Sequence, residues 1–146
     1  MGLLEGKKGL VFGVANERSL GWAIAKACAS HGASVGISYL NERLERRARP
    51  LAESIGAPVC APCNVQKPEE IERLLETTKE NMGGLDFLVH SLAFANRDDL
   101  INDFSQTSLA GFRTAMEISC YSLIDLVNRS RPLLNKGASV ITLSYV

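Results

Sequence analysis

The sequence has no excess of either charge, no long apolar run and few cysteines, and each shortage excludes a class of protein. Sixteen Lys and Arg residues balance sixteen Asp and Glu residues, so the chain lacks the basic surface of a typical nucleic-acid-binding domain. The longest apolar stretches, residues 9–15 and 85–89, fall far short of the ~20 residues that a membrane-spanning helix needs. The N-terminus lacks the pattern of a secretory signal. We therefore expect a cytoplasmic protein of one domain, with neither nucleic acid nor membrane as a partner.

Four cysteines, at positions 28, 60, 63 and 120, are too few for a disulfide-stabilised scaffold in a chain of 146 residues. Cys60 and Cys63 have the spacing of a redox or zinc half-site, but there is no second cysteine pair and both histidines are distant in sequence. The alternatives are a thiol redox module and cysteines packed in the core. The missing second pair favours core cysteines, and we expect no metal site.

Short apolar runs alternate with longer segments in which apolar residues recur every three or four positions, a pattern typical of βαβ units. The runs predict five parallel strands buried on both faces, at residues 9–12, 33–39, 58–65, 85–91 and 139–145. The fold class is therefore α/β, with a Rossmann-like doubly wound parallel sheet. Because such folds have about six strands, we expect residues 1–146 to be an incomplete dinucleotide-binding domain, truncated after the fifth strand.

The segments between the runs predict helices. The first buries a face that includes Leu20 and Ala27, and the last begins near Ser108 and packs Phe112 and Met116 into the core. Four glycines follow predicted helices, where a left-handed residue is common: Gly32, Gly56, Gly83 and Gly137.

A glycine-bearing turn, residues 13–21, leads from the first predicted strand into a helix. In a doubly wound fold this turn holds the pyrophosphate of a dinucleotide. Gly13 lets the backbone approach a ligand, and Ser19 and the free amides at the helix start can donate to phosphate oxygens. The spacing is not GxGxxG, so an ordinary strand-to-helix turn with Ser19 as its N-cap is the alternative.

The ends of the later strands supply further candidates. Leu40 follows the second strand and can pack on the ribose or adenine, and no acid stands there, so the residues leave NADH and NADPH both open. Asn64 can offer its amide to an adenine edge, with Val65 as an apolar wall. For His90, at the end of the fourth strand, a buried structural hydrogen bond is favoured over a catalytic role.

Taken together, these segments resemble a known family. Gly13 with Ser19, Asn64 with Val65, and residues 90–95, 118–122 and 143–145 are similar to the NADH-dependent enoyl-[acyl-carrier-protein] reductases, a divergent branch of the short-chain dehydrogenases. The TGxxxGxG and NNAG motifs of ordinary short-chain dehydrogenases are absent, which favours this branch. The resemblance covers essentially all of the chain but only the N-terminal part of the family's length.

The resemblance implies that the parent protein reduces trans-2-enoyl-acyl-carrier-protein to acyl-acyl-carrier-protein with NADH in fatty acid biosynthesis. It implies a homotetramer, with Ala95 at the border of the acyl substrate and Tyr145 as the first of two active-site tyrosines, beside the thioester carbonyl. The cofactor-binding residues that it implies are Gly13, Ala15, Ser19, Leu20, Asn64, Val65, Ser91, Leu92 and Ala93.

The sequence departs from the family's pattern at two positions, because the family usually has Asp where Asn64 stands and commonly Gln where Leu40 stands. We therefore expect a less polar adenosine pocket. The second tyrosine and a lysine lie beyond Tyr145 in the family, so we expect residues 1–146 alone to be inactive. The alternatives are a carbonyl-reducing short-chain dehydrogenase and a noncatalytic NAD-binding module.

Overall fold

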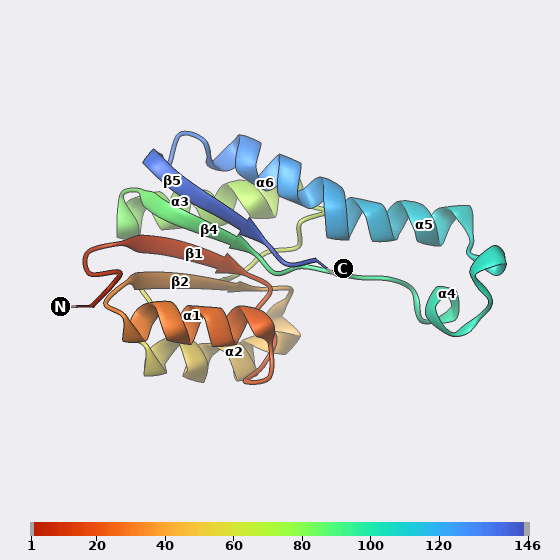
Figure 1. The fold of residues 1–146 in the computed structure, drawn as a ribbon, viewed down its shortest axis with the longest axis horizontal. Coiled ribbons are helices and arrows are strands. Elements are labelled where there is room, and N and C mark those ends of the chain that lie inside the picture. Colours follow the sequence, from red (N-terminus) through yellow and green to blue (C-terminus); the bar gives the residue numbers. More distant parts are fainter. Residues whose placement is uncertain (1, 145–146) are drawn as a thin grey trace.

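The computed structural model describes residues 2–144, and these form a parallel sheet between two layers of helices (Figure 1). The strand order is β3-β2-β1-β4-β5, and every neighbouring pair is parallel. This arrangement confirms the predicted α/β fold with a Rossmann-like sheet. The strands are β1 (Lys8–Phe12), β2 (Ser34–Tyr39), β3 (Cys60–Pro62), β4 (Leu85–His90) and β5 (Leu134–Thr142).

Helices α1 and α2 cover one face of the sheet, and α3 and α6 cover the other (Figure 1). None of the helices in residues 2–144 has the length and apolar character needed to cross a bilayer. The helices are α1 (Leu20–Ser30), α2 (Glu42–Ser54), α3 (Pro68–Met82), α4 (Arg97–Ile101), α5 (Leu109–Met116) and α6 (Ser122–Ser130). A 3₁₀ turn spans Phe104–Gln106, and a π-helical turn, Glu117–Tyr121, joins α5 to α6.

Two hydrophobic cores lie on the opposite faces of the sheet. Successive side chains of a strand point to opposite faces, so Leu10 of β1 packs in the core beneath α3 and α6, while Val11 packs in the core beneath α1 and α2. Both are fully buried. Burial on both faces explains why β1, β2 and β4 read as continuous apolar runs. The same burial predicted for β5 is wrong, because β5 lies at the edge of the sheet and its residues are exposed or half-buried, with Ile141 at 48%.

Two strands differ from the predicted ranges by more than one residue. β3 covers only Cys60–Pro62 of the expected residues 58–65, and β5 begins at Leu134, before the expected residue 139. The pairing of β4 with β5 shifts register between Leu85 and Phe87, and Gly137 lies within β5 at this irregularity with φ of +81°. Gly137 therefore serves a strand irregularity and does not end a helix. Gly32, Gly56 and Gly83 do have positive φ after helices, as predicted.

The buried face of α1 also differs from the prediction. Leu20 is 67% exposed and Ala27 is exposed, whereas Trp22 and Ala25 are buried. Because α1 carries apolar residues around most of its circumference, periodicity does not select one face. Burying the large Trp22 ring removes the most apolar surface from water and selects the face observed.

The predicted last helix is interrupted. It begins as expected, with Ser108 Oγ accepting a hydrogen bond from Gly111 N at 2.9 Å, but the π-helical turn divides it into α5 and α6. Phe112 is 55% exposed and Met116 is 44% exposed, so the core packing predicted for them is wrong. The physical reason is that α5 extends past the end of the sheet, where the described residues place no second layer against it (Figure 1).

Candidate functional site

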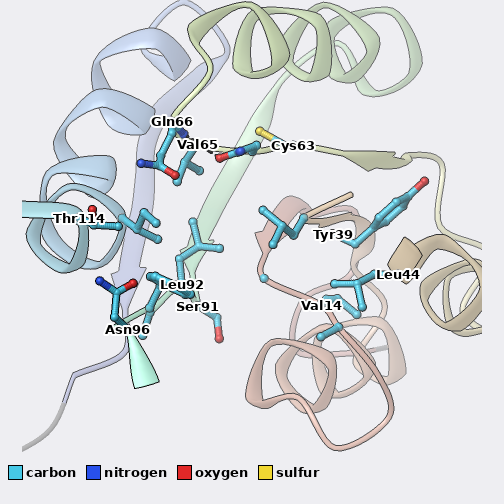
Figure 2. A pocket seen from close by; sticks show the side chains of 17 residues that line it. Val14, Tyr39, Leu44, Cys63, Val65, Gln66, Ser91, Leu92, Asn96 and Thr114 are labelled. Carbon is cyan, nitrogen blue, oxygen red and sulfur yellow. Dashed lines mark hydrogen bonds between the residues drawn. The ribbon is translucent and has the colours of Figure 1, made fainter. Parts of the chain in front are cut away.

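A cavity of about 520 Å³ lies at the carboxyl ends of the strands. It opens between the turns that follow β1 and β4, where the strand order reverses direction, which is the usual ligand position in a doubly wound sheet. Most of the predicted cofactor residues line it: Gly13, Ala15, Leu40, Asn64, Val65, Ser91, Leu92 and Ala93. The structure therefore brings together turns that are far apart in sequence (Figure 2).

Gly13 joins the turns after β1 and β4. Its φ is +92°, and a Cβ added there would overlap the carbonyl oxygen of Ser91. The same two turns are tied by Ser91 N, which donates to Phe12 O at 3.2 Å. A residue with a side chain would therefore suffer both an unfavourable backbone conformation and a collision. This explains why the cavity wall needs glycine at this position.

Ser19 stabilises the turn through hydrogen bonds and is not among the residues that line the cavity. Its Oγ accepts hydrogen bonds from Ala15 N and Asn16 N, each at 3.0 Å. Ser19 occupies the N-cap position of α1 but makes no side-chain hydrogen bond to the helix, so it is not the ordinary N-cap of the alternative hypothesis. A hydroxyl that accepts two hydrogen bonds still has its own hydrogen to donate. The exposed side chain of Leu20 lies outside the cavity lining.

The turn after β3 is organised around Asn64. Its side-chain Oδ1 accepts from Gln66 N at 3.0 Å, and its backbone N donates to Glu70 Oε2 at 2.8 Å. The bonds that Glu70 accepts from Asn64 N and from Lys67 Nζ, at 2.9 Å, hold the pKa of its carboxyl below the usual value. Oδ1 has a second lone pair, so this lone pair and the amide NH₂ of Asn64 are both available to contact a ligand.

His90 is buried beside the site but does not line the cavity. Its Nε2 lies 2.7 Å from Ser122 Oγ, and its Nδ1 lies 2.9 Å from Thr142 Oγ1. The single hydroxyl hydrogen of Ser122 is donated to Ile118 O at 2.6 Å, so Nε2 carries the proton and Nδ1 accepts from Thr142. Burial lowers the pKa of His90 and favours this neutral form. These bonds confirm the structural role predicted for His90.

The cysteine pair lacks the properties of a reactive site. Cys63 is buried, and burial raises the pKa of its thiol to about 12; burial also raises the pKa of Cys60. Both are free thiols, and residues 2–144 contain no group of three or more His, Cys, Asp or Glu side chains placed to hold a metal ion. Thiols that stay protonated are poor nucleophiles and metal ligands. The structure thus favours the interpretation of Cys60 and Cys63 as packed residues.

Several lining residues were not among the predicted ones. Val14, Tyr39, Gln66 and Phe94 adjoin predicted strand ends, so position in the chain could have indicated them. Cys63 likewise directly follows β3. The lining residues for which the sequence offered no such signal lie on α2, α5, the π-helical turn or the loops: Leu44, Asn96, Thr114 and Ile118.

One predicted substrate-side residue falls outside the cavity lining, and the other lies beyond the described residues. Ala95 is half-buried and adjoins lining residues on both sides in the chain, but it does not itself line the cavity. Tyr145, predicted beside the thioester carbonyl, lies outside the described residues.

A parallel sheet in this order, with a glycine turn beside a cavity at the point where strand order reverses, defines a Rossmann-type nucleotide-binding fold. Residues 13–146 match the family model described as enoyl-(acyl carrier protein) reductase. The chain belongs to this family.

Named relatives agree with the family assignment. The chain is 47% identical to the NADH enoyl-[acyl-carrier-protein] reductase FabI of Nostoc sp. over 98% of its own length and 57% of the relative's. It is 43% identical to the FabI of Rickettsia bellii, over 99% of this chain and 55% of that protein. The chain thus spans about half the length of the curated relatives it matches.

Solved structures show the same likeness. The Anaplasma phagocytophilum enoyl-(acyl-carrier-protein) reductase in complex with NAD has a TM-score of 0.93 and 44% identity, covering 98% of this chain and 55% of that one. The Aquifex aeolicus NADH enzyme has a TM-score of 0.95 and 41% identity, covering 99% of this chain and 57% of that one.

Proposed function

We propose that residues 1–146 form the dinucleotide-binding part of an NADH-dependent enoyl-[acyl-carrier-protein] reductase, an enzyme that reduces trans-2-enoyl-acyl-carrier-protein in fatty acid biosynthesis. One observation carries the proposal: in a member of this family, the turns after β1, β2, β3 and β4 converge on one cavity at the switch point of the sheet. Relatives that are 43–47% identical to this chain support it, since their names specify NADH, and the Anaplasma structure contains NAD.

The residues present fit a dinucleotide. The cavity volume of about 520 Å³ lies within the range of cofactor sites, which is roughly 300–1,000 Å³. The missing side chain of Gly13 lets the turn after β4 pack against the turn after β1 at the cavity wall. The first turn of α1 presents amides without helical partners toward a pyrophosphate. In this proposal Leu20 contributes its backbone amide at that turn, so the exposure of its side chain does not conflict with its role. Ala15 completes the pyrophosphate side, and the Ser19 hydroxyl acts there by holding the Ala15 and Asn16 amides of this turn.

The adenosine side is formed by the turns after β2 and β3. The amide NH₂ of Asn64 faces the adenine edge, and Leu40 and Val65 provide apolar walls. Leu40 is 49% exposed, so a bound adenosine would cover apolar surface that is now in contact with water. This burial supports binding without the polar contact that the family's commoner glutamine would supply.

On the other side of the cavity, residues 91–93 line the nicotinamide ribose, and Ala95 borders the acyl chain. When bound, NADH supplies the hydride that is added to the β-carbon of the enoyl thioester. The chain's own residues hold the ribose and exclude water from the reaction. The hydroxyl of Tyr145 is placed by this proposal beside the thioester carbonyl, where a donor stabilises developing negative charge.

We further propose that the protein acts in the cytoplasm as a homotetramer, with acyl-carrier-protein-bound enoyl chains as its substrate. The assembly is supported by apolar side chains that α4 and α5 expose to solvent, which a monomer would leave in water: Leu100 at 71%, Leu109 at 65% and Phe112 at 55%.

The test is calorimetric titration of the purified protein with NADH and, separately, NADPH, followed by an assay of enoyl-thioester reduction. We expect saturable NADH binding that is tighter than NADPH binding, and no reduction of simple ketones. Failure of the folded protein to bind NADH would overturn the proposal. Turnover of ketones with no turnover of enoyl thioesters would instead identify a carbonyl-reducing short-chain dehydrogenase.

A further inference from the structure

The π-helical turn between α5 and α6 changes which group donates a hydrogen bond to one backbone carbonyl, that of Ile118. Ser122 N donates to Glu117 O, five residues earlier, so the carbonyl of Ile118 loses the amide partner that an α-helix would provide. The Ser122 hydroxyl replaces that amide by donating to Ile118 O at 2.6 Å, and His90 Nε2 donates to the same hydroxyl at 2.7 Å. The side chains of Ser122 and His90 therefore stabilise the turn in place of the α-helical backbone hydrogen bond.

Side chains of the π-helical turn form hydrogen bonds with other segments of the site. Glu117 Oε2 accepts from Gln66 Nε2, of the turn after β3, at 3.0 Å. Ser119 Oγ contacts the backbone of Phe94, in the loop after β4, twice: it accepts from Phe94 N at 3.0 Å and is 3.2 Å from Phe94 O, to which it donates. Gln66 and Phe94 both line the cavity.

The two bonds from Ser119 hold one end of a segment whose other end is already held. Ser91 N donates to Phe12 O of β1, which anchors the start of the segment. Ser119 anchors Phe94 at its end. Leu92 and Ala93 lie between these anchors, and both line the cavity. Ser119 itself is absent from the cavity lining, so it acts on the wall of the cavity from outside.

We propose that Ser119 is a positioning residue for cofactor binding: by clamping the Phe94 backbone, it fixes the shape of the wall formed by residues 91–93. This inference rests on the proposed function, because that wall is the one assigned to the nicotinamide ribose. Ordering the loop before the ligand arrives removes an entropic cost from binding, so loss of the clamp weakens affinity without removing any ligand contact.

The test compares NADH affinity in Ser119→Ala, Ser119→Thr and Ser108→Ala with that of the wild-type protein. Ser119→Ala loses both bonds to Phe94, and we expect the Kd for NADH to rise about tenfold. Ser119→Thr keeps a hydroxyl and restores most of the affinity. Ser108→Ala is the matched control, because it removes the N-cap of α5 and lowers the Tm, but leaves the Kd unchanged.

Hydrogen exchange supplies a readout that needs no ligand. The Phe94 amide is expected to exchange slowly in the wild-type protein without ligand and faster in Ser119→Ala. The amides of the core strands should exchange at the same rate in both proteins. Wild-type affinity in folded Ser119→Ala, or unprotected exchange of Phe94 in the wild-type protein, would overturn the inference while leaving the proposed function intact. If the wild-type protein does not bind NADH, the proposed function fails first.

Discussion

The hydroxyl of Ser19 holds two successive backbone amides of the glycine turn, although its own side chain does not face the cavity. Ser19→Ala would leave Ala15 N and Asn16 N without this acceptor. We expect the free energy of unfolding to fall by about 1 kcal/mol and the Kd for NADH to rise roughly tenfold, because the turn loses its shape on the ligand side. Denaturant unfolding and calorimetry measure the two effects.

Ser30→Ala is the control for Ser19, since Ser30 Oγ donates to Ala27 O at the opposite end of α1. It removes the same chemical group from the same helix and is expected to leave NADH affinity unchanged. Equal affinity of both variants would show that Ser19 does not shape the site.

His90 predicts a specific dependence of stability on pH. Burial lowers its pKa in the folded state, so the unfolded chain, in which the pKa is near 6.5, binds the proton more readily. The contribution of His90 to the free energy of unfolding is therefore fully present above about pH 6.5. It is lost as the pH falls from there toward the folded-state pKa of His90. The slope in that window is at most about 1.4 kcal/mol per pH unit.

His90→Gln tests this assignment by chemical denaturation across the same pH window. The variant is expected to be less stable at neutral pH, because Ser122 and Thr142 lose their ring partner, and to lack the slope. Replacing the exposed His31 with Gln is the matched control, because it removes an imidazole that lies outside this buried network. If His90→Gln retains the wild-type slope, another group is responsible for it.

At the scale of the element, the β1–α1 turn depends on contact between backbones. A methyl group at Gly13 would overlap the Ser91 carbonyl oxygen, whereas Gly56, after α2, also has positive φ but meets no atom within 4 Å of an added Cβ. We expect Gly56→Ala to cost about 1 kcal/mol from backbone strain alone. Gly13→Ala should cost at least ~2 kcal/mol more and should severely weaken NADH binding.

Urea unfolding of the two glycine variants, with NADH titration of each, separates these contributions. Similar destabilisation of both variants would mean that the turns after β1 and β4 are not in the close contact described here. The comparison isolates the collision because both substitutions add the same methyl group at a positive φ.

At the scale of the whole molecule, burial orders the reactivity of the four cysteines. Cys120 is exposed, Cys28 and Cys60 are half-buried with raised pKa values, and Cys63 is buried with a pKa of about 12. At mildly alkaline pH, iodoacetamide should modify Cys120 first and Cys63 last, at the rate at which the core opens. Peptide mass spectrometry over time measures the order, with Cys120→Ser as the control. Early modification of Cys63 would contradict this packing and revive the redox interpretation.

Patterns local in the sequence determined much of this protein. Continuous apolar runs indicated the strands, with β1, β2 and β4 buried on both faces. Glycines indicated helix ends at Gly32, Gly56 and Gly83, and Gly13 marked the turn beside the cavity. These succeeded because backbone conformation and alternation of side chains depend on near neighbours in the chain. Positions at strand ends could likewise be assigned to one edge of the sheet, since parallel strands share a direction.

Only the tertiary structure decided which faces and segments meet. It selected Trp22 over Leu20 for burial in α1, interrupted the last helix with a π-helical turn, and brought Thr114 and Ile118 to the cavity and Ser119 to Phe94. The physical reason is that helical periodicity specifies which residues share a face but not what that face will contact. That choice depends on the area and the hydrogen bonds gained between segments distant in sequence, which exist only once the sheet and its helices have packed.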